Sequence, residues 1–489
     1  MYIVHLAAEC APVAKVGGLG DVVYGLAREL EIRGHAVELI LPKYQRMRYD
    51  HIWGLQVTMP ELWVPWRGGG LPCTVWFGFV HGRKCFFIEP RSADNFFNRP
   101  EFYGYPDEVM RWAFFSKAAL EFLVQSGKRP DIIHAHDWQT ALVPVLLYEM
   151  YAAALPLQRV CLTIHNFKHQ GVTGPQFLEA TGLARPEVFG RADKLGDDTH
   201  RGAYNLLKGG IVYANFITTV SPRHAWEAQH TDQGAGLGRV LAVHQEKFGG
   251  VLNGVDYDVW NPEVDPYIKA RYGPGQLDSK YANKAALRDR FLLREAFRPI
   301  VAFIGRLDYQ KGVELIRHSL FWSLEHGAQF ILLGTSPMPE INADFARLKQ
   351  QLNDHPDCHL ELGFSEELAH LIYAGADLFI VPSVYEPCGL TQMIALKYGT
   401  VPVVRAVGGL ADTVFDRDYA HVPFDQRNGY VFQHADRPGL ESALSRAVGL
   451  WHYFPEDFRQ LMRQGMARDY SWNVPGQHYL NIYDHIRHK

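Results

Sequence analysis

Two positively charged side chains follow an apolar run in the second half of the chain. In the stretch FIGRLDYQKG, Arg306 comes directly after the run and Lys311 lies at the beginning of a helix-like segment. Cations that converge near a helix N-terminus suit a diphosphate, because the backbone N–H groups and the helix dipole there also favour negative charge. A pair of solvated surface cations is the alternative interpretation of the same two residues.

A carboxylate occupies a proline-rich turn further along the chain. Glu386 lies in VPSVYEPCGLTQ, just before a helix that we expect to begin around Gly389. A carboxylate at that place can cap the helix. It can equally face a polar substrate, with the N–H groups of Gly389 and Leu390 directed at a phosphate. The residues themselves leave both interpretations open.

The sequence Gly-Gly-Leu-x-Asp occurs twice, each time between an apolar run and a helix-like run. The first copy, KVGGLGD, contains Lys15, Gly17 and Gly18, and the second lies in AVGGLAD, which begins at Ala406. Glycine lets backbone N–H groups approach a phosphate closely, and the neighbouring Lys15 favours that interpretation of the first copy. A tight turn is the alternative, and the second copy can simply pack a helix closely on its sheet. Neither copy has the spacing of a dinucleotide-binding fingerprint or of a P-loop.

Histidines end two neighbouring apolar runs of the first half. The segment HAHDW contains His134, His136 and Asp137, and IHN contains His165 and Asn166. The alternate spacing of the first two histidines places them on one face of a strand. Zinc would need further nitrogen or sulfur ligands, and none is indicated nearby, so we expect no metal site. A structural role is the ordinary one for a single histidine, but two such strand ends together favour a polar crevice.

An alternation of short apolar strands and amphipathic helices must position these residues. The strand-like runs of the first half include YIVHLAAE, HAVELILP, PDIIHAHD and RVCLTIHN, and TVWFGFVHGRKCFFIEP is typical of a hairpin whose turn is His81-Gly82. The same alternation restarts at RPIVAFIGR in the second half. It predicts mostly parallel sheets with helices on both faces. Such sheets bind ligands at the carboxyl ends of their strands, which is where the residues above lie.

The number of strands is too large for one sheet, so we expect two doubly wound domains. The N-terminal domain should span residues 1–248 and the C-terminal domain residues 249–465, with the crossover just before VLNGVD. Residues 466–489 should form a terminal segment whose helix packs back on the N-terminal domain.

The composition is that of a soluble globular protein. Of the 489 residues, 47% are hydrophobic and 21% are charged, and the formal net charge is −4. No basic run indicates nucleic acid, and no acidic tail indicates a basic partner. The six cysteines lack Cys-x-x-Cys spacing, which favours a reducing compartment. Neither a signal peptide nor an apolar run of about 18 residues is visible, so we expect a cytoplasmic protein that does not span a membrane.

Taken together, these motifs resemble those of the glycogen and starch synthases. The matching segments follow the family's order over nearly the whole chain and include KVGGLGDVV, HAHDWQTAL, TIHNFKHQG, VLNGVDYDVWNP, GRLDYQKG and PSVYEPCGLTQMIALKYGTVPVVRAVGGLADTV. The resemblance implies an α/β fold of GT-B architecture, in which two Rossmann-like doubly wound domains face each other across a deep cleft. It also implies a retaining glucosyltransferase that moves glucose from ADP-glucose to the non-reducing end of an α-1,4-glucan or maltooligosaccharide.

The resemblance also implies roles for individual residues. Glu386 would lie close to the transferred glucose, and Arg306 and Lys311 would hold the diphosphate. His165 would hold the same glucose, and Asp137 would face the donor and acceptor sugars. The residues implied to line the donor site are Lys15, Gly17, Gly18, Asp21, Asn166, Asn253, Cys388, Gly389, Leu390 and Thr391. Neither a metal nor a cofactor beyond ADP-glucose and its product ADP is implied.

The chain departs from the wider group of retaining GT-B enzymes at one position. Many of them have a second glutamate eight positions after the first, where this chain has Ile394, so ribose recognition must come from elsewhere. A transferase that uses UDP-glucose or another acceptor is one alternative function. A catalytically inactive glucan-binding protein is another, although binding alone does not need all the residues assigned to chemistry. The sequence leaves the oligomeric state open.

Overall fold

The computed structural model describes residues 1–489, and the chain divides into two compact units. The first unit comprises Met1–Gly254 together with Trp472–Lys489, and the second comprises Val255–Ser471. The last residues of the chain therefore return to the first unit after the second is complete.

Both boundaries lie a few residues later than positions 248 and 465. Strand β11 (Phe248–Gly250) pairs in parallel with β10 (Phe216–Thr219), so the first unit extends beyond residue 248. The hydroxyl of Tyr470 donates a hydrogen bond to the Thr413 carbonyl inside the second unit, so that unit extends beyond residue 465.

The first unit is built on a nine-stranded sheet with the order β11-β10-β7-β6-β1-β2-β5-β4-β3. All neighbours from β11 to β5 are parallel, whereas β4 is antiparallel to both β3 and β5. The remaining strands are β1 (Tyr2–Leu6), β2 (Ala36–Pro42), β3 (Ile52–Trp66), β4 (Gly69–Val80), β5 (Arg83–Pro90), β6 (Ile132–His136) and β7 (Arg159–Ile164). A separate short ladder joins β8 (Val172–Thr173) to β9 (Tyr204–Asn205).

The hairpin predicted from TVWFGFVHGRKCFFIEP is confirmed as β4 and β5. Its two turn residues, His81 and Gly82, have φ values of 45° and 87°, as a tight hairpin turn with the twist of the flanking strands requires. The neighbouring strand β3 was not predicted. It contains Gly54 and two prolines and lies at the sheet edge with an irregular register, which weakens the alternation that identifies a strand.

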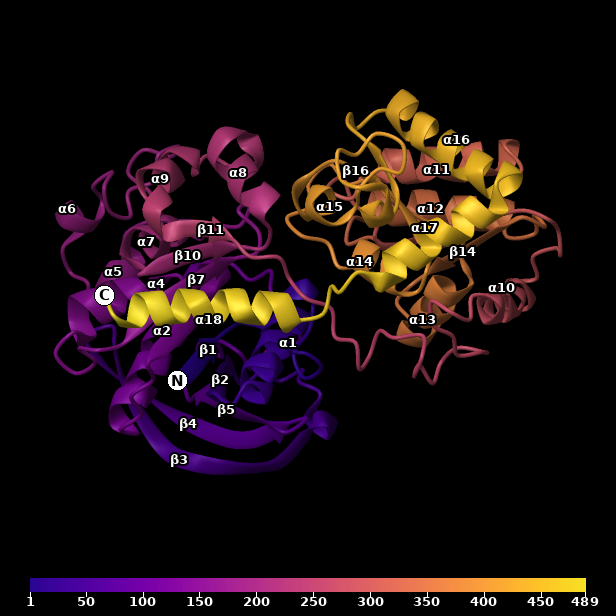
Figure 1. Cartoon of the computed structure of the whole chain (residues 1–489). Helices are drawn as coiled ribbons and strands as arrows, with labels where there is room; N and C mark the ends of the chain where they lie inside the picture. Colours follow the sequence, from indigo (N-terminus) through magenta and orange to yellow (C-terminus); the bar gives the residue numbers. More distant parts are fainter. The chain divides into compact units, whose positions relative to one another are not determined.

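The helices of the first unit form two groups. Helix α1 (Gly18–Ile32) packs on α18 (Asn473–Arg487), and Figure 1 shows α18 lying across the strands of this unit. The other group packs around α2 (Glu108–Gln125), α4 (Leu142–Leu146) and α7 (Leu206–Tyr213). The shorter helices are α3 (Asp137–Thr140), α5 (Gln176–Thr181), α6 (Pro186–Phe189), α8 (Pro222–His230) and α9 (Gly238–Val243). Two helix groups are what a sheet covered on both faces needs.

The second unit is built on a six-stranded, entirely parallel sheet with the order β14-β13-β12-β15-β16-β17. Its strands are β12 (Ile300–Arg306), β13 (Gln329–Thr335), β14 (Cys358–Leu362), β15 (Leu378–Val381), β16 (Val401–Arg405) and β17 (Tyr430–Phe432). Its helices are α10 (Asp278–Phe291), α11 (Val313–Glu325), α12 (Pro339–Leu352), α13 (Glu366–Gly375), α14 (Thr391–Lys397), α15 (Gly408–Thr413), α16 (Arg437–Tyr453) and α17 (Pro455–Ala467). Its central strands are buried along most of their length, as parallel strands between helices usually are.

The strand order of each parallel sheet reverses once, and we call this place the reversal point of the unit. In the first unit it lies between β1 and β6, and in the second between β12 and β15. The loops that leave the two flanking strands diverge to opposite faces of the sheet, which opens a crevice where doubly wound proteins bind ligands. Most of the residues predicted to do chemistry lie at the ends of these strands, whereas His165 and Asn166 follow β7 and Asn253 follows β11.

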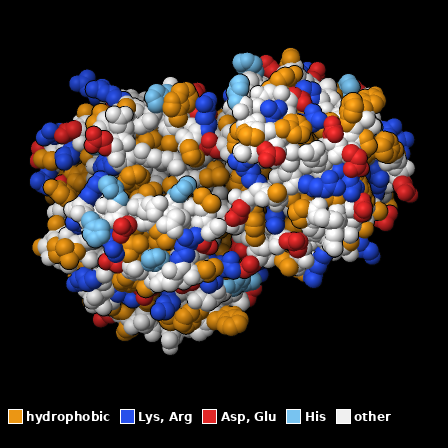
Figure 2. Space-filling model, viewed as in Figure 1, with side chains coloured by type: hydrophobic (Ala, Val, Ile, Leu, Met, Phe, Trp, Pro, Cys, Tyr) orange, Lys and Arg blue, Asp and Glu red, His pale blue; other side chains and the backbone are white.

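The charged side chains are mixed over the surface. Figure 2 shows Lys and Arg interspersed with Asp and Glu on the viewed face of each unit. This distribution agrees with the small formal net charge of −4. None of the helices combines the length and the apolar character needed to cross a membrane.

Candidate functional site

The first glycine-rich loop leaves β1 at the reversal point of the first unit. Gly17 precedes α1, which begins at Gly18, and a Cβ placed on Gly17 would meet no atom within 4 Å. The Glu9 carboxylate accepts the Gly17 N–H group at 3.1 Å and so holds the loop. Beside it, Lys15 forms an ion pair with Asp21 at 2.8 Å. The loop therefore offers open space and a cation, while two of its N–H groups, those of Val16 and Gly17, are already engaged by Glu9.

Asp137 directly follows β6, and its side chain holds the backbone just after β7. Its Oδ1 accepts the backbone N–H groups of His165 and Asn166 at 2.6 and 3.3 Å. Asp137 itself has a φ of 57°, a left-handed conformation that few residues other than glycine, asparagine and aspartate adopt readily. Burial raises the pKa of its carboxyl to about 7, and the two N–H groups oppose this rise. In this structure Asp137 thus positions the residues that follow β7.

The histidines at the two strand ends contact each other. The Nδ1 atom of His136 lies 3.1 Å from Nε2 of His165. Burial lowers the pKa of His165 to about 3 and that of His136 well below its ordinary value, so both rings are neutral. His5 on β1 also joins the group, with Nδ1 3.1 Å from Nε2 of His136. The expectation that no further nitrogen lies near His134 and His136 was wrong, because β1 pairs with β6 and places His5 opposite His134.

Lys311 and Glu386 come together beside the reversal point of the second unit. The Lys311 Nζ atom lies 2.5 Å from Oε2 of Glu386, which also accepts a hydrogen bond from the Ser383 hydroxyl at 2.9 Å. The Glu386 side chain is buried, whereas Lys311 is partly exposed. This pair joins the loop after β12 to the loop after β15. Lys311 is therefore not a solvated surface cation.

Arg306 is the last residue of β12 and keeps its guanidinium exposed. Its side chain is 58% exposed, and its only ion pair is with Asp308 at 3.5 Å. The other carboxylate oxygen of Asp308 accepts the Lys311 N–H group at 2.9 Å, which fixes the turn between the two cations. Helix α11 begins just after this turn, with Gly312 at a φ of 73°. The two predicted cations thus precede one helix, with Arg306 available to an anion.

The structure argues against the helix-cap interpretation of Glu386. Its carboxylate is taken up by Lys311 and Ser383, and helix α14 has no side-chain cap. The helix begins at Thr391 and not around Gly389, because Gly389 has a φ of 75°, which ends any helical path. Leu390 and Thr391 therefore form the helix start. Cys388 is buried in the same turn.

The second glycine-rich loop packs directly against the loop of Glu386. A Cβ on Gly408 would clash with the Glu386 carbonyl, and one on Gly409 would clash with the Cys388 backbone. The Gly409 N–H group also donates to the Pro387 carbonyl at 3.1 Å. These glycines allow two backbones to approach closely, so this copy serves close packing, although against the loop of Glu386 and not against the sheet as predicted.

Asn253 is a buried member of the predicted donor-site residues. It lies after β11, near the end of the first unit's main segment, and is 5% exposed. Its Oδ1 atom has no hydrogen-bond partner, although it is a buried acceptor. A buried amide oxygen of this kind is available to a ligand N–H or O–H group.

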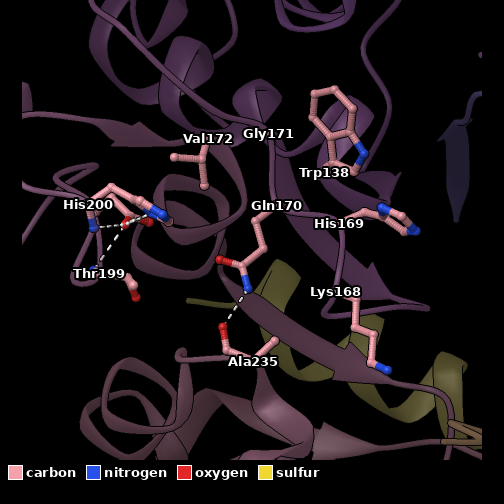
Figure 3. Close-up of a pocket in the computed structure, with 10 residues that line it drawn as sticks. Trp138, Lys168, His169, Gln170, Gly171, Val172, Thr199, His200 and Ala235 are labelled. Carbon is pink, nitrogen blue, oxygen red and sulfur yellow. Dashed lines mark hydrogen bonds and ion pairs between the residues drawn. The ribbon is translucent and has the colours of Figure 1, made fainter. Parts of the chain in front are cut away.

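A cavity of about 420 Å³ lies beside the His165 segment in the first unit. Its lining includes Trp138, Lys168, His169, Gln170, Asp197 and His200, and Figure 3 shows Gln170 between Trp138 and His200. The Trp138 ring packs on Gly171, whose φ of 65° and missing Cβ leave room for it. The sequence shows Trp138 next to Asp137. It gave no indication that Asp197 and His200, which belong to a loop distant in the sequence, form another wall of this cavity. An aromatic ring beside amide and carboxylate groups suits a sugar.

The predicted residues thus form a group in each unit. In the first unit they are Lys15, Gly17, Gly18, Asp21, Asp137, His165, Asn166 and Asn253, which follow β1, β6, β7 and β11. In the second unit they are Arg306, Lys311, Glu386, Cys388, Gly389, Leu390 and Thr391, which follow β12 and β15. The residues that sequence reasoning missed are His5 and Ser383, each of which supports one of the predicted residues through a hydrogen bond or hydrogen-bonded chain.

Comparison with known families and proteins gives matches over the whole chain. The family model described as starch synthase catalytic domain matches residues 2–243, and that of the group 1 glycosyl transferases matches residues 298–449. A protein named glycogen synthase 2 from Methylococcus capsulatus is 63% identical over 486 residues, covering 99% of this chain and 100% of the relative. A glycogen synthase 1 from Synechococcus is 63% identical over 491 residues, covering 100% of both chains.

Solved structures give the same result. The catalytic domain of starch synthase IV from Arabidopsis thaliana, bound to ADP and acarbose, matches with a TM-score of 0.96 and 45% identity, covering 100% of this chain and 99% of that one. A sucrose-phosphate synthase from Thermosynechococcus elongatus matches with a TM-score of 0.62 at 19% identity, covering 99% of this chain and 98% of that one, which is a likeness of fold alone.

The raised pKa of Asp137 predicts a pH-dependent effect of Asp137→Asn on stability. The folded pKa of about 7 lies above the unfolded value of about 3.9, so the carboxyl favours folding at low pH and this contribution is lost as the pH rises to 7. Asparagine keeps the Oδ1 acceptor, tolerates the left-handed backbone and does not ionise. We expect the melting temperature of Asp137→Asn, relative to wild type, to rise between pH 5 and pH 7.5 and then level off.

The control for this measurement is Asp137→Ala. Alanine also does not ionise, but it has no acceptor for the His165 N–H group and is strained at a φ of 57°, so this variant should melt below Asp137→Asn at every pH. A difference between Asp137→Asn and wild type that does not change with pH would contradict the raised pKa.

Proposed function

The chain belongs to the glycogen and starch synthase family, and on this premise we propose that it transfers glucose from ADP-glucose to the 4-hydroxyl at the non-reducing end of an α-1,4-glucan, with retention of configuration. It is a glycosyltransferase, and its predicted GT-B fold class is confirmed. The observation that carries the proposal is that both groups of predicted residues lie at the carboxyl ends of parallel strands and include the residues at each reversal point. Ligands of doubly wound sheets bind at this place.

The charges of the second unit support a diphosphate leaving group. Arg306 offers an exposed guanidinium, and Lys311 lies one short turn away. When the bond between the glucose C1 atom and the diphosphate oxygen breaks, negative charge grows on that oxygen. Cations that are already in place stabilise this growing charge without reorganisation. We assign Arg306 and Lys311 to this role.

We assign Glu386 to stabilise the glucose ring, which becomes electron-poor during the reaction. Loss of the diphosphate leaves positive charge on the glucose ring, and a nearby carboxylate stabilises it. Retention requires the acceptor 4-hydroxyl to attack from the face that the diphosphate leaves. The new C1–O4 bond then forms as the C1–O bond to phosphate breaks, and the hydroxyl proton passes to the departing phosphate. The Lys311–Glu386 pair prepares both groups, because each holds the other and Glu386 is also held by the Ser383 hydroxyl.

The neutral groups of the first unit suit the hydroxyl groups of the donor glucose. His165 is half-buried and uncharged, and Asp137 holds its backbone. Asn166 follows it and adds an amide that can donate and accept. Hydrogen bonds from such groups fix a hexose without adding net charge. We assign the transferred glucose to these residues, and Lys15 with its open glycine loop to the donor phosphates.

The cavity of Figure 3 is proposed as an acceptor subsite. Trp138 supplies an apolar ring for a sugar face, and Gln170 and Asp197 supply polar groups. Gln170 is itself fixed, because its Nε2 group donates to the Phe167 and Ala235 carbonyls at 2.8 Å. A rigid polar group beside an aromatic ring is what selective binding of a glucan needs.

The direct test of the function is a glucosyl-transfer assay with a maltooligosaccharide primer. We expect chain extension with ADP-glucose, a lower kcat/KM with UDP-glucose, and activity that does not require added divalent metal. Equal or reversed donor preference would favour the transferase with another donor. Primer binding without extension by either donor would favour an inactive glucan-binding protein.

Lys311→Ala tests the role of the cation. Loss of one preorganised partner of a developing charge costs roughly 3 kcal/mol, so kcat should fall about a hundredfold, and calorimetric ADP binding should weaken. Glu386→Gln should lower kcat strongly while ADP binding stays nearly intact. Because the two side chains are in contact at 2.5 Å, the double variant should lose less than the sum of the single losses.

Lys349→Ala is the matched control, because Lys349 also pairs with a glutamate, Glu361, at 3.4 Å in the same unit but away from the reversal point. It should keep wild-type kcat. Wild-type turnover of Lys311→Ala would remove that residue from the proposed site.

Gly171→Ala tests the acceptor subsite. Its Cβ would clash with the Trp138 ring, so the ring must move from its place in the cavity wall. The KM for the primer should rise roughly tenfold, as a loss of about 1.4 kcal/mol in stacking predicts, while the KM for ADP-glucose changes little. Gly127→Ala is the control, because Gly127 has a similar φ of 71° but open space around it. If both variants change the primer KM equally, Trp138 is not part of the acceptor site.

A further inference from the structure

A line of hydrogen-bonded imidazoles extends from the centre of the first sheet to its polar end. Nδ1 of His5 lies 3.1 Å from Nε2 of His136, and Nδ1 of His136 lies 3.1 Å from Nε2 of His165. His5 and His136 are fully buried, and His165 is half-buried at the end of the line. The strands β1, β6 and β7 are adjacent, so the sheet itself sets this spacing.

Each ring of the line carries a single N–H group. Burial lowers the pKa of His5 and of His165 to about 3, and that of His136 well below its ordinary value, so all three imidazoles are neutral. A neutral imidazole donates through one nitrogen and accepts through the other. His136 contacts a histidine through each nitrogen, so the donors of the line point either all toward His165 or all toward His5.

The inner end of the line decides between the two directions. Nε2 of His5 is buried and has no hydrogen-bond partner. If the donors pointed toward His5, this nitrogen would carry a buried N–H group without an acceptor. If they point toward His165, it carries only an unused lone pair. Orphaned buried N–H groups are the rarer and more costly case in folded proteins, so the donors point toward His165.

We infer that His5 and His136 are positioning residues that place the proton of His165 on Nδ1, so that this ring presents a hydrogen-bond donor to its ligand. Nε2 of His165 accepts from His136, and Nδ1 has no hydrogen bond within the protein. The free nitrogen of a half-buried ring is the one that a ligand meets. On the proposed function, on which this step rests, that ligand is a hydroxyl oxygen of the transferred glucose.

A metal ion is the competing explanation for so many buried histidines. Ligand atoms of His5, His134 and His136 lie within 4.8 Å of one another. His134, however, uses Nε2 with the Thr163 hydroxyl and Nδ1 with the Tyr483 hydroxyl, both at 2.6 Å. Among the ring nitrogens of these three histidines only Nε2 of His5 is left without a partner. A metal would have to break hydrogen bonds that already satisfy the trio.

The proton positions can be read directly from protein labelled with [15N]histidine. Long-range proton–nitrogen NMR correlations distinguish a protonated ring nitrogen from a bare one, and a His165→Gln variant assigns the His165 signals. We expect wild-type His165 to carry its proton on Nδ1, without any substrate present. A proton on Nε2 of His165, or a stoichiometric metal ion in the purified protein, would overturn the proposal.

Two substitutions of His136 then test its influence on His165. In His136→Leu the donor is lost, so His165 should populate the form protonated on Nε2, and kcat/KM for ADP-glucose should fall about tenfold, the effect of one hydrogen bond. In His136→Asn the side-chain amide donates from the place of Nδ1, so the Nδ1 proton of His165 and most of the activity should be recovered. An unchanged His165 signal in His136→Leu would contradict the proposal.

Tyr483→Phe is the matched control. It removes a buried hydrogen bond to His134, on the same strand as His136, but leaves the line to His165 intact. Its melting temperature should fall while the His165 signals and kcat stay those of wild type. Because the NMR measurement needs no substrate, its result is independent of the proposed function. A wild-type protein without glucosyl transfer would contradict that function and leave the assignment of the His165 proton standing.

Discussion

The reversal of strand order in each parallel sheet is the constraint on which the site depends. Strands on the two sides of a reversal point send their loops to opposite faces, so neither loop can cover the gap between the two strand ends. In the first unit the flanking strands deliver the glycine loop after β1 and Asp137 after β6. In the second they deliver Arg306 after β12 and Glu386 after β15. Chemistry is possible at these places because the fold leaves them open.

A second constraint in the first unit is that its buried histidines stay neutral. A charged imidazole inside the sheet would lose hydration that no carboxylate there replaces, so His5, His136 and His165 remain neutral. Neutral rings can still form directed hydrogen bonds, and a line of them transmits a preference for one proton position. Asp137 complements the line by holding the backbone of His165. The side chain and the backbone of His165 are thus fixed by two consecutive residues at the end of β6, His136 and Asp137.

The sequence predicts the ends of strands better than it predicts which side chains contact each other. An apolar run followed by polar residues identifies the carboxyl end of a strand, which is why the positions of Asp137, His165 and Arg306 were correctly predicted as strand ends. The pairing of Lys311 with Glu386, 75 residues apart, depends on β12 lying next to β15, which no local pattern encodes. His5 escaped notice for the same reason. It is a polar residue within an apolar strand, and its importance arises only from the register of β1 against β6.

The neutral state of His165 suits the role that we propose for it. In the proposed function Arg306 and Lys311 hold the diphosphate, whereas His165 holds a hydroxyl group of the transferred glucose. A protonated His165 would be a cation, and a cation also attracts phosphate. A neutral donor binds a hydroxyl oxygen without attracting phosphate. Burial keeps His165 uncharged, and by our inference the line of buried histidines gives its ring a defined donor at the same time.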